Sequence, residues 1–317
     1  MSPWGGSEHG GARLGQGAAS AAGAAAEHGG PAEEWARTMT GAPPARRRGR
    51  AGRNLPAALG VGLFLGAAVL VSLYTYRIGF VALVVAVISV AIWELSRAAS
   101  RVEARPPLVP LLVGGLAMDV LAWYRGAEAL AVAFLLTALA CQVWRLADGP
   151  VGYLRDTSTA VFIALYVPFL AGFAVLLTVP DDGADRVVTF MATVVCSDVG
   201  GYVAGVFFGR HPMAPTVSPK KSWEGFTGSV LACAVAGAVF LPVFFAAPAW
   251  HGALYGLAIA VTATLGDLGE SMIKRDLGIK DMGSILPGHG GVMDRLDSLL
   301  PAAAVAYLLL TALAPPT

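Results

Sequence analysis

Long apolar runs recur from Leu55 to near the C-terminus, and they restrict the possible folds of this chain more than any other feature. A bilayer core of about 30 Å requires about 20 apolar residues per spanning helix. Nine runs of this kind lie at 55–75, 78–96, 107–124, 127–146, 158–179, 187–208, 226–248, 250–273 and 298–314. The sequence therefore predicts an all-α, polytopic integral membrane protein with about nine transmembrane helices. Only Tyr74 to Arg77 separate the first two runs, so a single broken hairpin is an alternative there.

Composition agrees with this class and excludes two others. Of the 317 residues, 56% are hydrophobic and 14% are charged, whereas a soluble domain has about 25% charged residues. A soluble globular protein and a wholly disordered chain are both excluded. The net charge of +1 gives no reason to expect a nucleic-acid partner. The three cysteines lie inside apolar runs without CxxC spacing, which predicts core residues.

The first 54 residues differ from the rest of the chain. They are rich in Gly, Ala, Pro and Glu, have no apolar period, and end in a cluster of five arginines between Arg46 and Arg53. We expect a disordered tail over 1–54, without a removable signal peptide, and a transmembrane domain over 55–317. The basic cluster beside the first run is typical of a topology signal.

The placement of basic residues predicts the orientation. With the tail in the cytoplasm, all but three of the 22 lysines and arginines fall on the inner side, the exceptions being Arg77, Arg125 and Arg186. This bias favours a cytoplasmic N-terminus. We expect the protein to lie in the plasma membrane. The longer inner loops, 209–225 and 274–297, carry Gly, Pro, Lys, Asp and His together, so any chemistry is expected on the cytoplasmic face.

Charged residues inside two of the apolar runs need a partner. Asp198 lies in the run 187–208, where a carboxylate is costly unless it faces protein, water or a cation. The helix expected there also carries glycines at 201, 205 and 209, a stripe suited to helix contact and a candidate surface for a homodimer. Further along, Asp267, Glu270, Ser271 and Lys274 follow at i, i+3, i+4 and i+7, which places them on one helix face. They could form a structural salt-bridge ladder, or the acids could hold a divalent cation while the lysine meets a phosphate.

Two inner loops supply more candidates. SPKKSWEG at 218–225 contains Lys220 and Lys221, which suit a polyphosphate but could equally be topology lysines beside a helix N-cap. The segment from Lys274 to Ser298 surrounds His289 with glycines and ends with Asp294 and Asp297 on either side of Arg295. Glycines allow backbone amides to approach an anion, although His289 could be an ordinary solvated histidine. Together these elements favour metal-assisted phosphoryl or nucleotidyl transfer at the inner face.

The motifs resemble those of a known family, the phosphatidate cytidylyltransferases, also called CDP-diacylglycerol synthases. The resemblance rests on SDVGGY at 197–202, SPKKSWEG, GDLGES at 266–271, SMIKR at 271–275, Lys280-Asp281, PGHGG at 287–291 and DRLD at 294–297. It covers 197–298 well, and the earlier runs agree only in general character.

The resemblance implies transfer of a cytidylyl group from CTP to phosphatidic acid, with one or two Mg²⁺ ions and a monovalent cation as a further candidate. It implies a multi-pass enzyme of the membrane whose site meets CTP and lipid at the cytoplasmic face. The implied catalytic residues are Asp267, Asp294, Lys274, Asp281 and His289. The implied metal ligands are Asp267, Asp294, Asp198 and Asp297. The implied phosphate-binding residues are Lys220, Lys221, Lys274, Arg275, Lys280 and Arg295.

Two other functions are compatible with such a chain. A CTP-dependent polyprenol or phytol kinase would also need metal, CTP and an inner-face pocket. A secondary transporter could use the intramembrane acids for ion coupling, although we find no internal repeats in the sequence.

Overall fold

The computed structural model describes residues 66–283, 285 and 290–315, and almost all of the regular structure in them is helical. An apolar helix at Gly66–Thr75 comes first. The elements that follow are α4 (Arg77–Ala99), η1 (Ser100–Val102), α5 (Leu108–Leu146), α6 (Tyr153–Ala164), η2 (Leu165–Phe169), α7 (Leu170–Leu177), α8 (Gly183–Phe208), β1 (Pro212–Ala214), β2 (Ser218–Ser222), α9 (Trp223–Phe245), α10 (Ala249–Asp276), α11 (Met293–Leu296) and α12 (Leu299–Leu313). The expected all-α membrane class is confirmed, while the tail over 1–54 lies outside the described residues.

The predicted spans correspond to these helices. Seven helices among the described residues are long and apolar enough to cross a membrane. One of them, α5, is broken at Gly126 (φ 79°), and a Cβ at Gly114 would overlap the side chain of Thr137. Its two parts therefore fold back on each other and correspond to the separate runs 107–124 and 127–146. The first run, 55–75, is described only from residue 66, so the total of nine and the orientation stay predictions.

One span contains a local irregularity with a clear cause. Pro168 lies in η2, a π-helical turn between α6 and α7. Proline has no amide hydrogen and its ring crowds the preceding turn, so the regular i to i−4 ladder cannot continue through it. The helical run continues on both sides, from Tyr153 to Leu177.

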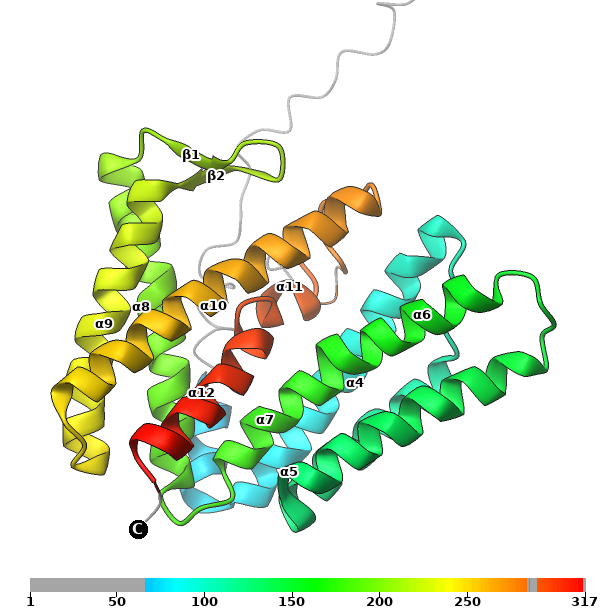
Figure 1. Ribbon diagram of the computed structural model, residues 1–317, viewed down its shortest axis with the longest axis horizontal. Helices are drawn as coiled ribbons and strands as arrows, with labels where there is room; N and C mark the ends of the chain where they lie inside the picture. Colours follow the sequence, from blue (N-terminus) through cyan, green and yellow to red (C-terminus); the bar gives the residue numbers. More distant parts are fainter. Residues whose placement is uncertain (1–65, 284, 286–289, 316–317) are drawn as a thin grey trace, which may run out of the picture. The chain divides into compact units, whose positions relative to one another are not determined.

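The buried side chains form two cores. The first joins α4 through α7 and includes Ile92, Met118 and Ile163, together with Met293 of α11. The second joins α8, α9, α10 and α12, with Tyr255 and Ile259 of α10 fully buried. Figure 1 shows α10 and α12 between the α8–α9 pair and the α4–α7 group, in agreement with contacts of α12 with both α10 and α7.

The glycine stripe of α8 is used within the chain. A Cβ at Gly201 would overlap the hydroxyl of Ser229 on α9, and one at Gly200 would lie 2.8 Å from the carbonyl oxygen of Gly228. The two helices therefore touch along their backbones, as the prediction of helix contact required. Since α9 covers this stripe, a homodimer would have to use another face.

Adding a methyl group at this contact should destabilise the protein. In a Gly228→Ala variant the new Cβ would lie 2.7 Å from the Gly200 carbonyl oxygen and closer still to Ala204. We expect the free energy of unfolding to fall by about 1–3 kcal/mol, the usual cost of overpacking. Thermal unfolding in detergent micelles measures this, with Gly66→Ala as the control because a Cβ there meets nothing within 4 Å. Equal stability of the two variants would contradict the close approach of α8 and α9.

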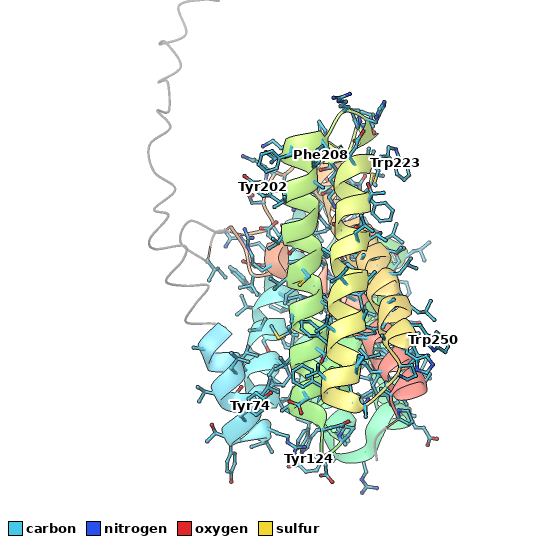
Figure 2. The ribbon with its side chains drawn as sticks, turned by 90° about the vertical axis from the view of Figure 1, so that its left-hand side faces the viewer. Tyr74, Tyr124, Tyr202, Phe208, Trp223 and Trp250 are labelled. Carbon is cyan, nitrogen blue, oxygen red and sulfur yellow. The ribbon has the colours of Figure 1, made fainter. Side chains whose placement is uncertain are left out.

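Exposed side chains on α8 and α9 indicate which surface faces lipid. Val195, Val199, Leu231 and Val235 are all more than half exposed, with relative exposures from 57% to 66%. Exposed aromatic residues bound this apolar surface. Figure 2 shows Tyr202, Phe208 and Trp223 toward the end that carries β1 and β2, and Tyr74, Tyr124 and Trp250 toward the opposite end. Aromatic belts of this kind are typical of the two membrane–water interfaces.

Candidate active site

A cavity of about 300 Å³ lies between α8, α9, α10 and the β1–β2 hairpin. Asp198 of α8 and Asp267 of α10 line it, and Lys220 and Lys221 of β2 reach it from the hairpin. Ser197, Gly201, Ser222 and Ser229 contribute to the same wall. The structure therefore brings four predicted residues from three separate motifs together around one cavity. Their spacing in the sequence could not establish this proximity.

The hairpin is held in place by the start of α9. The hydroxyl of Ser222 accepts a hydrogen bond from the Gly225 amide at 3.1 Å, so the predicted N-cap is confirmed. The carboxylate of Glu224 accepts from the amides of Arg210 and His211 and contacts the His211 ring at 2.6 Å. These bonds fix both ends of the connection from α8 to α9, and with it the two lysines.

The polar face of α10 continues from this cavity along the helix. Asp267 pairs with Lys221, with 2.5 Å between Oδ2 and Nζ. One turn further, Glu270 is fully buried and forms an ion pair with Lys274. A Cβ at Gly266 would overlap the backbone carbonyl of Asp297, so α10 passes directly beside the start of α12. The predicted face of acids and lysine is therefore present, and it faces protein rather than lipid.

Lys274 connects this face to Asp294 of α11. Its ammonium lies 3.1 Å from Oδ1 of Asp294. The same carboxylate accepts hydrogen bonds from the Met282 amide at 3.0 and 3.2 Å and from the Gly291 amide at 2.8 Å. Asp294 thus binds the backbone on both sides of the glycine-rich segment and ties that segment to α10.

Glu94 on α4 is a further member of this site that our sequence reasoning missed. Its side chain is 1% exposed, and Oε2 accepts a hydrogen bond from the Met293 amide at 2.9 Å. A Cβ at Gly283 would overlap its carboxylate, and one at Gly291 would lie 2.7 Å from Oε2. A carboxylate inside an apolar run was the available signal, the same argument that selected Asp198.

Comparison with known proteins identifies the family of the chain. Residues 57–313 match the cytidylyltransferase family. The chain belongs to this family. A protein of Mycobacterium leprae named phosphatidate cytidylyltransferase is 48% identical over 282 residues, which cover 83% of this chain and 90% of the relative. One of the same name from Mycobacterium bovis is 44% identical over 299 residues, covering 90% and 97%. A third, from Brucella suis, is 41% identical over 146 residues, covering 44% and 54%.

The acids of this cytidylyltransferase family member fit a metal ion that is shared with substrate. Asp198, Asp267 and Asp297 are close enough to interact electrostatically with one another. No three acidic, histidine or cysteine side chains converge on one position within the described part of the chain. Mg²⁺ commonly takes one or two carboxylates and completes its coordination with water and substrate phosphates. Asp198 and Asp267, which line the same cavity, would supply two carboxylates to such an ion, and Asp267 is at present paired with Lys221.

The other predicted residues of this cytidylyltransferase lie in different places. Arg275 donates to the carbonyl of Val217 at 3.3 Å and so joins α10 to the hairpin. Lys280 and Asp281 line a second cavity beside α4, rather than the one that holds Asp267. Arg295 interacts electrostatically with Asp198. The prediction for His289 lies outside the described residues.

Removing the Glu94 carboxylate should lower activity without removing a substrate contact. In a Glu94→Ala variant the Met293 amide loses its acceptor, and the segment around Asp294 is less well positioned. Small displacements of reacting groups cost about 100-fold in rate, so we expect kcat to fall by about 10- to 100-fold with an unchanged helical circular dichroism spectrum. Glu94→Gln keeps an acceptor oxygen and should retain much more activity. The exposed Glu128 provides the control Glu128→Ala, and equal rates for both alanine variants would contradict a positioning role.

Proposed function

We propose that this chain transfers a cytidylyl group from CTP to phosphatidic acid, which gives CDP-diacylglycerol and pyrophosphate in phospholipid biosynthesis. The observation that carries this proposal is the match over 57–313 together with relatives of that name at 44% and 48% identity. The cavity between α8, α9, α10 and the hairpin supports it, because it combines two carboxylates with two lysines.

The reaction is a direct displacement at phosphorus. A phosphate oxygen of phosphatidic acid attacks the α-phosphorus of CTP, the bond to the bridging β-phosphate oxygen breaks, and pyrophosphate leaves. No covalent enzyme intermediate is needed. Lys220 and Lys221 lie where they could bind the triphosphate, and positive charge there would stabilise the negative charge that the leaving group gains. Lys221 would exchange its contact with Asp267 for one with phosphate.

Asp198 and Asp267 are the residues we propose to hold Mg²⁺, with Asp297 and Asp294 as further candidates and one or two ions bound. A bound Mg²⁺ supplies charge neutralisation to the reacting phosphates and to the departing pyrophosphate. Asp294 differs from the other three because two backbone amides and Lys274 already occupy its oxygens. A monovalent cation remains a further candidate.

We also propose that the cavity faces the cytoplasm from the plasma membrane. The hairpin end carries Lys220, Lys221, Arg210 and Arg275, in keeping with the inner-side excess of basic residues. CTP is water-soluble and phosphatidic acid lies in the bilayer, so the membrane surface is where both can meet. The hairpin end of the helix bundle, where this cavity lies, would meet this requirement if it is at the inner membrane surface.

Removing divalent cations should abolish transfer reversibly. If the carboxylates act through Mg²⁺, activity should fall to background with excess EDTA and return when Mg²⁺ is added beyond the chelator. Ca²⁺ is larger and prefers more ligands, so we expect it to restore much less activity. Full activity of EDTA-treated, dialysed protein would contradict a metal requirement.

The proposed function is tested with purified protein, phosphatidic acid, Mg²⁺ and CTP labelled with ³²P at the α or the γ position. Label entering the organic phase from the α position alone would support cytidylyl transfer. Entry from the γ position alone would indicate a CTP-dependent kinase. If neither label enters the organic phase although the protein is folded, the proposal is wrong. A secondary transporter is then the better hypothesis.

A further inference from the structure

A second cavity, of about 520 Å³, lies between the end of α4 and the segment that follows α10. Trp93, Arg97 and Arg101 line it from α4 and η1, and Lys280 and Asp281 line it from the other side. In the sequence, Arg97 and Arg101 are only two of the basic residues whose excess predicts the inner side of the membrane. Their position around a cavity gives them a further use.

The cationic side chains of this cavity are available for a ligand. Arg97 lies over the ring of Trp93, with 5.3 Å from its guanidinium carbon to the ring centroid. Among the described residues, no ion pair engages Arg97, Arg101 or Lys280. Two carboxylates also line the cavity: the buried Glu94, whose Oε2 accepts a hydrogen bond from the Met293 amide, and the exposed Asp281. The three cations therefore outnumber the two acids around the cavity.

The cavity borders exposed apolar surface as well as the polar end of the helices. Trp93 is 39% exposed and Val102 is 42% exposed, so this part of α4 and η1 carries apolar surface beside its arginines. Tryptophan and arginine together are typical of the membrane–water interface, where lipid headgroups lie. Arginine binds phosphate through two parallel hydrogen bonds, which suits a phosphomonoester better than a single point charge does.

The cavity is also connected to the proposed reaction site. Met282 lines it, and the amide of Met282 donates to both carboxylate oxygens of Asp294. Asp294 in turn contacts Lys274 on the polar face of α10. A ligand bound against Lys280 and Asp281 would therefore touch the same backbone segment that Asp294 holds.

We propose that the cavity lined by Arg97, Arg101 and Lys280 binds the phosphomonoester headgroup of the lipid substrate at the membrane surface and delivers it to the reaction site. This inference rests on the proposed function. Arg97 and Arg101 bind the headgroup, while the acyl chains remain in the bilayer beside Trp93. The nucleotide uses the other cavity, so the two substrates approach from different sides of α10.

The test compares steady-state kinetics of the full chain in mixed micelles for wild type, Arg97→Gln/Arg101→Gln and Arg97→Lys/Arg101→Lys. Loss of charge-assisted hydrogen bonds should raise the KM for phosphatidic acid by about tenfold or more, with the KM for CTP and kcat nearly unchanged. The lysine variant should lie between. Arg105→Gln is the matched control, since Arg105 is an exposed basic residue of the same loop that does not line the cavity. If the double variant does not fold, the single variant Arg101→Gln replaces it in the same kinetic comparison.

Binding without CTP distinguishes a lipid phosphate from a free one. We expect native mass spectrometry to show dioctanoyl phosphatidic acid bound to wild type and not to the double glutamine variant. Equimolar inorganic phosphate or CTP should not displace the lipid from wild type. Equal competition by inorganic phosphate or CTP would overturn the lipid assignment. An unchanged KM for phosphatidic acid in the glutamine variant, with wild type active, would overturn this inference alone. Inactive wild type in the α-label assay would instead overturn the proposed function.

Discussion

Replacing Asp267 with asparagine should reduce cytidylyl transfer by about 100- to 1,000-fold or more, because it removes a negative charge from the wall of the cavity. Asp267 lines that cavity and is the partner of Lys221. Asparagine has the same shape but cannot hold a divalent cation as a carboxylate does, so kcat should fall much more than the affinity for either substrate. Initial rates with α-labelled CTP at several Mg²⁺ concentrations measure the effect.

The control for this variant is Asp276→Asn at the end of the same helix. Asp276 is exposed and lines neither this cavity nor the one beside α4. Its rate should match wild type within about twofold, the range expected for a surface change without a partner. A fully active Asp267→Asn enzyme would remove Asp267 from the reaction site.

Lys274→Met is expected to have the largest effect on stability. The ammonium lies between Glu270, which is fully buried, and Asp294, whose side chain is 7% exposed. Its removal leaves two buried carboxylates without a cation, a change that costs about 3–5 kcal/mol. Thermal unfolding in detergent should show a clear decrease in Tm, together with loss of cytidylyl transfer.

A second substitution separates the stability effect of Lys274 from its part in activity. In Lys274→Met/Glu270→Gln one of the two uncompensated charges is gone, so much of the lost stability should return. Activity should not return, because the lysine that ties α10 to Asp294 is still absent. If the single variant were as stable as wild type, the ion pairs of Lys274 would not be structural.

Much of the fold follows from the sequence because its dominant signal is local. Apolar runs of sufficient length have to form helices in a bilayer, and even the division of α5 near residue 126 follows from the interruption between two runs. Spacing also placed Asp267, Glu270 and Lys274 on one face of α10, since helix geometry fixes that relation within a few residues.

Contacts between distant segments could not be predicted in the same way. Glu94 and Met293 are 199 positions apart, and no helical or strand period relates them. The sequence also grouped Lys280 and Asp281 with Asp267, because all three belong to nearby motifs. The structure places them in different cavities, since the chain turns away from α10 after Asp276. Which residues hold metal or phosphate stays a prediction.

The continuous helix α10 has a consequence for how this enzyme can vary. It carries Asp267 toward one cavity and Lys274 toward Asp294. The two residues are seven positions apart, and each position adds about 1.5 Å of rise. The helix therefore fixes both the distance and the angle between Asp267 and Lys274. Inserting or deleting one residue between these positions would turn everything beyond it by about 100°. The length of this stretch therefore cannot change without separating the two groups of charges.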